Sequence, residues 1–185
     1  MIRSLMLFAH VVGVLMLFAG LGLERFGLDG VQRSMRRADA LPWLRLLAIV
    51  PRAFGVALAA IVASGFYLGA RVGVLGNDWM RASYGALVLM ALVSGPLSRS
   101  SMRALKHAAS RATDGDIASL REAASRPILR LSLRVRAAFG LAVVFLMIAK
   151  PDAGESLLVL ALAAAATVIT SFTGRMTPST AVQEL

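Results

Sequence analysis

Long apolar stretches separated by basic segments dominate the pattern along this chain. A membrane-spanning helix needs about 17–25 predominantly apolar residues. None of the stretches alternates with the period of two that a transmembrane β-barrel requires. The pattern therefore predicts an all-α fold, a polytopic transmembrane helical bundle. Its five spans are expected at approximately residues 4–23, 53–71, 79–97, 131–149 and 156–174.

The fourth stretch is the shortest, because its continuous apolar run covers only residues 137–149. As a helix this run rises about 20 Å, less than the roughly 30 Å thickness of the hydrocarbon core. Arg134 and Arg136 can snorkel, with their stems in the apolar region and their charges among the headgroups. The helix can then extend back to Leu131 and span the bilayer. A re-entrant hairpin is the alternative.

Composition agrees with a membrane protein. The chain is 58% hydrophobic and 16% charged, with a mean hydropathy of +0.74, whereas soluble domains are about 45–50% apolar and about 25% charged. A water-soluble enzyme of this composition would lack the polar surface to cover its core. There are no cysteines, which excludes disulfides, cysteine zinc sites and iron–sulfur clusters.

The net charge of +10 first suggests nucleic acid. However, sixteen of the twenty Lys and Arg residues lie in the connections after the first and third spans, at the start of the fourth span (Arg134 and Arg136), or after the last span. The positive-inside rule then predicts an N-terminus out and a C-terminus in the cytoplasm. We expect a multi-pass protein of a bacterial inner (plasma) membrane, whose basic loops face anionic inner-leaflet lipids, with no nucleic-acid partner. A cleaved signal peptide is the alternative for the first stretch, but its apolar run is long for one.

The chain is expected to be a single transmembrane domain over residues 1–185, with a cytoplasmic helical loop at 98–127. Within this loop, residues 114–116 (Asp-Gly-Asp) predict a turn. Asp116 is a candidate N-cap for a short helix over residues 117–126, and Pro127 is expected to end that helix.

Small residues mark expected helix-packing faces. Gly13 and Gly20 lie on one stripe of the first span, and Gly65, Gly69 and Gly73 form a doubled GxxxG at the end of the second. Such spacing lets membrane helices approach closely. It predicts packing within the chain or in a homodimer.

His10 is the main candidate for chemistry, because an ionisable side chain inside a span is costly. It could bind haem or a metal, relay a proton, or hydrogen-bond a Ser, Thr or Tyr of another helix. Met6, one turn earlier, could add a thioether ligand, and this pair suits monovalent copper better than zinc. His107 is expected on the opposite side of the membrane, so the two histidines cannot sandwich one haem. No hydrolase, nucleotide-binding or zinc-protease motif is present, which favours a protein that is not an enzyme.

The segment FAHVVGVLMLFAG resembles small bacterial inner-membrane proteins of the copper-resistance-D-like group. ASGFYLGA and FLMIAKPDAGESLLVL are similar to integral membrane proteins related to that group. The haem-linked protoporphyrinogen oxidase type is similar to this group. For that type, the resemblance implies a first-helix histidine that is paired with a lysine of a later span. Only His10 matches, because Lys106 and Lys150 lie outside the expected spans.

These observations leave three functional hypotheses. The first is a small transport or membrane-accessory protein in which His10 packs or contacts an ion. The second is a haem- or copper-binding redox protein that uses His10. The third is a non-catalytic scaffold that dimerises through Gly65 and Gly69.

Overall fold

The computed structural model describes residues 1–111 and 117–173, and all regular secondary structure within these ranges is helical, with no strand. The six helices of these described ranges are α1 (Ile2–Arg33), α2 (Arg37–Val72), α3 (Asp78–Arg111), α4 (Ala118–Ser125), α5 (Pro127–Ala149) and α6 (Ala153–Thr173). The predicted all-α class is confirmed. The expected turn at 114–116, with its Asp116 cap, lies outside the described residues, as does the expected end of the last span at 174.

Four stretches of helix among the described residues are long and apolar enough to cross a membrane. They are Ile2–Arg33, Arg37–Val72, Ala118–Ala149, which covers α4 and α5, and Ala153–Ser171. These stretches contain the first, second and fourth expected spans and nearly all of the fifth. The third expected span, residues 79–97, lies within α3 and stays a prediction.

The helices extend well beyond the apolar stretches. α1 continues past residue 23 to Arg33, and α2 already begins at Arg37, so only a short turn separates them. α2 continues through Pro42 and Pro51, although each proline removes a backbone N–H from the helix. It ends at Gly73, whose φ of 75° is the left-handed conformation that glycine adopts without a Cβ penalty.

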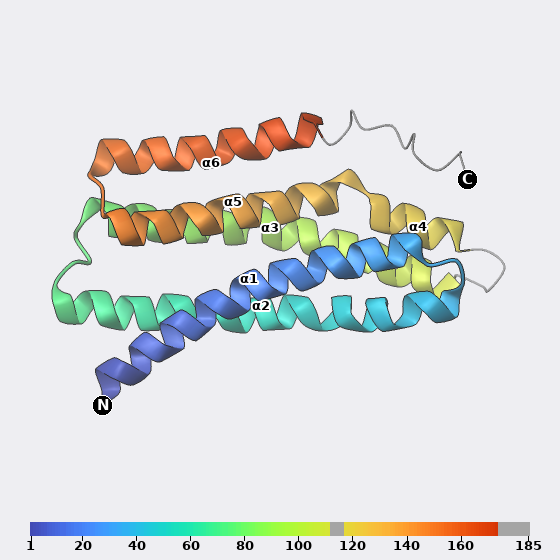
Figure 1. Ribbon diagram of the computed structural model, residues 1–185, viewed down its shortest axis with the longest axis horizontal. Coiled ribbons are helices and arrows are strands. Elements are labelled where there is room, and N and C mark those ends of the chain that lie inside the picture. Colours follow the sequence, from blue (N-terminus) through green and yellow to red (C-terminus); the bar gives the residue numbers. More distant parts are fainter. Residues whose placement is uncertain (112–116, 174–185) are drawn as a thin grey trace, which may run out of the picture.

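The long helices run side by side along the long axis of the molecule (Figure 1). The N-terminus lies at the same end as the α2–α3 and α5–α6 turns, and the α1–α2 turn and α4 lie at the opposite end. α1 packs mainly against α2, and α5 packs against α3 and α6. By contrast, the described backbones of α2 and α3 rarely approach each other closely, although side chains of the two helices meet in the core. The bundle is therefore an α1–α2 hairpin laid against a group formed by α3, α5 and α6.

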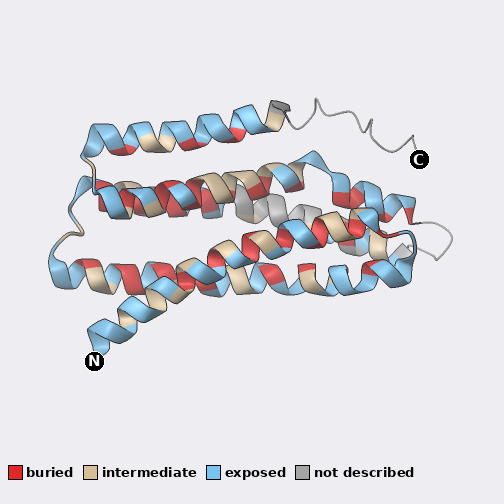
Figure 2. Ribbon diagram, in the orientation of Figure 1, coloured by how far each residue is buried: buried red, intermediate tan, exposed pale blue. Residues whose placement is uncertain are grey.

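Buried residues are distributed along the sides of the helices that face one another (Figure 2), and the apolar ones form two clusters. The cluster in the middle of the bundle includes Leu17, Leu21, Ile61, Met90 and Val143. The cluster beside α4 includes Leu28, Leu47, Leu105, Leu120 and Leu129. Large apolar side chains also cover the outside of α6, including Leu157, Leu158 and Leu162, as a lipid-facing helix requires.

Candidate functional site

Glu24 lies at the break between the two apolar clusters. It follows Leu21 and precedes Leu28 on the buried stripe of α1, at the spacing of three to four residues that one helix face requires. The side chain is buried only because α1 continues as a helix past the apolar stretch. Glu24 is thus a carboxylate at the core of the bundle.

Arg136 of α5 reaches Glu24 from the other side of the bundle. Its Nη2 donates to Oε1 of Glu24 at 2.6 Å, and both side chains are 4% exposed. Its Nε donates to the Ser132 carbonyl at 3.2 Å, and its Cζ lies 5.2 Å from the centroid of the Phe54 ring, within cation–π range. Arg136 therefore connects α1, α2 and α5. The expectation that it snorkels to the headgroups is corrected: a carboxylate within the bundle holds it inside.

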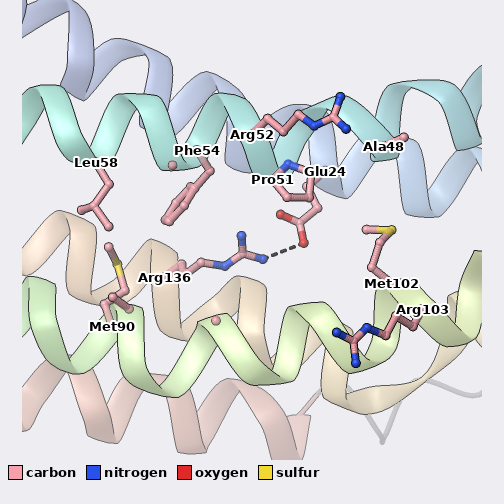
Figure 3. Close-up of a pocket in the computed structure, with 13 residues that line it drawn as sticks. Glu24, Ala48, Pro51, Arg52, Phe54, Leu58, Met90, Met102, Arg103 and Arg136 are labelled. Carbon is pink, nitrogen blue, oxygen red and sulfur yellow. Dashed lines mark hydrogen bonds and ion pairs between the residues drawn. The ribbon is translucent and has the colours of Figure 1, made fainter.

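A cavity of about 450 Å³ opens beside this ion pair, between α2 and α3 (Figure 3). We call it the Glu24–Arg136 cavity. Its walls come from three long helices besides α1, and its lining residues are Glu24, Ala48, Pro51, Arg52, Phe54, Gly55, Leu58, Met90, Ala91, Gly95, Met102, Arg103 and Arg136.

The charges that line the cavity are unequal. Among the described residues of the lining, three carry a guanidinium group, Arg52, Arg103 and Arg136, and Glu24 carries the one carboxylate; Arg136 is buried, whereas Arg52 and Arg103 are exposed. Arg52 lies on the α2 wall and Arg103 on the α3 wall (Figure 3). Within the part of the chain that the structure describes, neither has an ion-pair partner. The site can therefore attract an anion.

A second polar site surrounds His10 in the other half of the bundle. His10 Nδ1 lies 3.2 Å from the Ile61 carbonyl oxygen and 3.1 Å from Ser64 Oγ. The Ser64 hydroxyl itself donates to the Ala60 carbonyl. Both neighbours of Nδ1 are then acceptors, which assigns the proton to Nδ1 and leaves Nε2 with a lone pair. A hydrogen bond to a serine of another helix was one of the alternatives predicted for His10.

Gly65 lets α1, α2 and α3 meet at this second site. A Cβ at Gly65 would lie 3.2 Å from His10 Cε1 and 3.6 Å from the Tyr84 hydroxyl oxygen. The Tyr84 hydroxyl is buried and, within the described ranges, has no hydrogen-bond partner. Any larger residue at Gly65 would occupy the space between the imidazole and the phenol.

The other predicted packing glycines have different environments. A Cβ at Gly13 would lie 3.2 Å from the Ala57 carbonyl oxygen, so α1 and α2 approach closely there. At Gly69 it would lie 2.9 Å from Met80 Cε. Gly20 is buried, but a Cβ there would meet no atom within 4 Å, and Gly73 caps α2. These close contacts are made within the chain.

The donors around His10 suit haem or copper poorly. Only Nε2 is left as a ligand, and the neighbouring side-chain donors are the hydroxyls of Ser64 and Tyr84, which are hard oxygen groups. Met6 is half-buried on the same helix. No group of three or more His, Asp or Glu side chains that could hold a metal ion occurs among the described residues.

Sequence reasoning missed the Glu24–Arg136 pair, whose partners are 112 residues apart in the chain. Each residue stands at the edge of an apolar stretch, where a charge is ordinarily taken as a headgroup contact. The opposite signs at two such edges were the only available signal.

Comparison with known proteins adds no relative to this picture. The chain matches no family model, no curated protein and no solved structure.

Proposed function

We propose that this chain is an integral inner-membrane protein that binds an anionic, lipid-like molecule in the Glu24–Arg136 cavity, as a small transport or membrane-accessory protein. The observation that carries the proposal is the excess of arginine among the described residues of the cavity lining, where the exposed side chains of Arg52 and Arg103 accompany the buried Glu24–Arg136 pair. Charges inside a membrane protein are costly unless they are compensated, and they ordinarily mark a functional site.

The lining of the site favours a molecule that is partly apolar. Phe54, Leu58 and Met90 provide apolar wall beside the arginines. A molecule with an anionic head and an apolar body would match both parts of this lining.

The proposal includes five spans, with the N-terminus out and the C-terminus in. α3 runs the length of the bundle beside α5 (Figure 1), which supports a third span over residues 79–97. Arg33, Arg36 and Arg37 lie at the α1–α2 turn, at the same end as α4. The positive-inside rule places that end in the cytoplasm. The Glu24–Arg136 cavity then lies in the cytoplasmic half of the protein.

Native mass spectrometry of the full chain in a mild nonionic detergent tests the binding. We expect an anionic lipid-like molecule to copurify with the wild-type protein and to be lost from the variant Arg52→Gln/Arg103→Gln. The matched control is Arg37→Gln/Arg45→Gln, which removes the same charge from exposed positions outside the cavity. If both variants lose or keep the molecule equally, the cavity is not its binding site.

A further inference from the structure

The ion pair between Glu24 and Arg136 leaves part of each group without a partner. Arg136 donates through Nε to the Ser132 carbonyl and through Nη2 to Glu24 Oε1. A guanidinium has five N–H donors, and Arg136 Nη1 has no hydrogen-bond partner within the described residues. Glu24 Oε2, likewise, accepts no hydrogen bond from a described residue. A paired carboxylate and guanidinium can form two parallel bonds, so this pair has spare bonding capacity on both sides.

The spare capacity lies at a cavity. Both side chains are 4% exposed, yet both line the Glu24–Arg136 cavity. They point toward each other beside Phe54 (Figure 3), and the Phe54 ring, 5.2 Å from Arg136 Cζ, limits how the guanidinium can turn. A buried polar group without a hydrogen bond is costly. A ligand in the cavity can supply the missing partner of Arg136.

The buried charges indicate what such a ligand does to the site. Glu24 and Arg136 are the buried ionisable side chains of the described residues, and they neutralise each other. Arg52 and Arg103 are exposed, so water solvates them and they do not enter this balance. An anion beside Arg136 would therefore add a second negative charge to one guanidinium. Two carboxylates that share a site do not both stay ionised.

Glu24 is the group that can become neutral. A protonated carboxyl group has an O–H donor, and Glu24 Oε2 is the oxygen without a described donor. With a proton from the solution on this oxygen, Glu24 can donate to the bound anion, and Arg136 can pair with the same anion. A ligand with one negative charge then restores neutrality inside the bundle, whereas a ligand with two charges would exceed it.

The lining indicates the chemical class of this monoanion. A planar guanidinium matches the geometry of a carboxylate, which is also the group that Arg136 already binds in Glu24. Leu58 and Met90 provide apolar wall at one end of the cavity (Figure 3). The volume of about 450 Å³ lies within the range of small-molecule sites. A carboxylate that carries a hydrocarbon chain fits both parts of the lining.

We infer that a fatty-acid-like carboxylate binds Arg136 in place of Glu24, and that Glu24 takes up one proton as the anion binds. This inference rests on the proposed function, because it names the ligand class of the same site and adds the coupling to a proton. The site would thus bind an anion and a proton together. Its affinity for the anion would rise as the pH falls.

Proton uptake by the wild-type chain in a nonionic detergent tests this inference without any substitution. The probes are decanoate, acetate and decane-1-sulfonate. The sulfonate stays ionised between pH 6 and pH 8, so any pH dependence of its binding comes from the protein. We expect about one proton to be taken up for each sulfonate bound, and its affinity to fall about tenfold per pH unit. Acetate, which lacks the chain, should bind at least about tenfold more weakly than decanoate.

The variant Glu24→Gln identifies the group that takes up the proton. Its binding of decane-1-sulfonate should be independent of pH, and at pH 8 about tenfold or more tighter than that of the wild type, because no proton is needed. The sulfonate should also raise its melting temperature more than that of the wild type, since it neutralises Arg136. The matched control is Glu122→Gln, which removes an exposed carboxylate of α4 outside the cavity and should behave as the wild type.

Few other groups could cause the pH dependence. Among the described lining residues, the charged groups that face the cavity with Glu24 are Arg52 of α2, Arg103 of α3 and Arg136 of α5, and α4 contributes none. Arginines stay protonated in proteins. His107 is exposed on α3, one turn beyond Arg103, and His107→Ala should keep the pH dependence.

The possible failures can be told apart. If the anions bind without proton uptake and are lost from Arg52→Gln/Arg103→Gln, the coupling to Glu24 is wrong and the proposed function stands. Proton uptake that persists in Glu24→Gln would also overturn the coupling. If acetate binds as tightly as decanoate, the ligand class is wrong. If no anion binds, or if binding is the same in Arg52→Gln/Arg103→Gln, the proposed function fails as well.

Discussion

The ion pair between Glu24 and Arg136 should be the most sensitive polar contact in the bundle. Replacing either residue by Met removes one charge and leaves the other buried. At the 2.6 Å distance between Arg136 Nη2 and Glu24 Oε1, two unit charges attract by about 6 kcal/mol at an effective dielectric constant near 20. Desolvation offsets part of this attraction. Breaking such a pair by removing one partner costs about 3–5 kcal/mol.

The two single variants should differ in how the remaining residue responds. In Arg136→Met the carboxyl group of Glu24 can take up a proton and become neutral. In Glu24→Met the guanidinium of Arg136 cannot lose its charge, because arginine stays protonated in proteins. Arg136 keeps the Ser132 carbonyl and the Phe54 ring as neighbours, but neither neutralises it. We therefore expect Glu24→Met to be at least as destabilising as Arg136→Met.

The double variant Glu24→Met/Arg136→Met tests whether the cost of each single variant comes from the charge that is left without its partner. Replacing both charges with apolar side chains of similar length should recover most of the lost stability, because no buried charge remains. The assay is the free energy of unfolding in detergent micelles, measured for all four proteins of the double-mutant cycle. A coupling energy of about 3 kcal/mol is expected from the cost of a broken pair. Single-variant costs below about 1 kcal/mol, or costs that simply add, would refute the reasoning.

Three further predictions concern packing and topology. Gly30→Ala should destabilise the fold by about 1–3 kcal/mol, because its Cβ would overlap the indole ring of Trp43. The control Gly22→Ala, whose Cβ would meet no atom within 4 Å, should leave the stability unchanged. Thermal unfolding of the two variants compares them directly. Ser64→Ala should cost about 0.5–1.5 kcal/mol, since the His10 Nδ1–H keeps the Ile61 carbonyl as acceptor, and a loss well above this range would show that the hydroxyl has a second role. A reporter that is active only outside the cytoplasm should work in the α2–α3 turn and fail in the α1–α2 turn; the reverse result would invert the proposed orientation.

The sequence by itself determined the class of protein. Apolar stretches of the length of a bilayer can only be accommodated as helices in lipid, because every backbone N–H and C=O must find a partner within the segment. The helical class is confirmed, and four of the predicted spans fall on helices long and apolar enough to cross a membrane. The third span and the direction of the termini stay predictions from residue pattern and charge.

Helix ends and partners were decided by the tertiary structure. The polar and basic residues after Leu23 predict a loop, yet α1 continues to Arg33. It continues because its next turns pack Leu28 and Val31 into the cluster beside α4. The same extension buries Glu24. His10 could be assigned a hydroxyl partner by chemistry, but not Ser64 in particular, since 54 residues separate them.

The Glu24–Arg136 cavity shows most clearly what the sequence could not predict and the packing of the helices decided. Each of its charged residues looks like an ordinary headgroup contact in the sequence, because local hydropathy records only how polar each stretch is. Whether Arg136 points outward to the headgroups or inward to a carboxylate depends on which helix lies opposite. That choice is made by the packing of α1 against α5, where a buried cation is stable only beside its counter-charge.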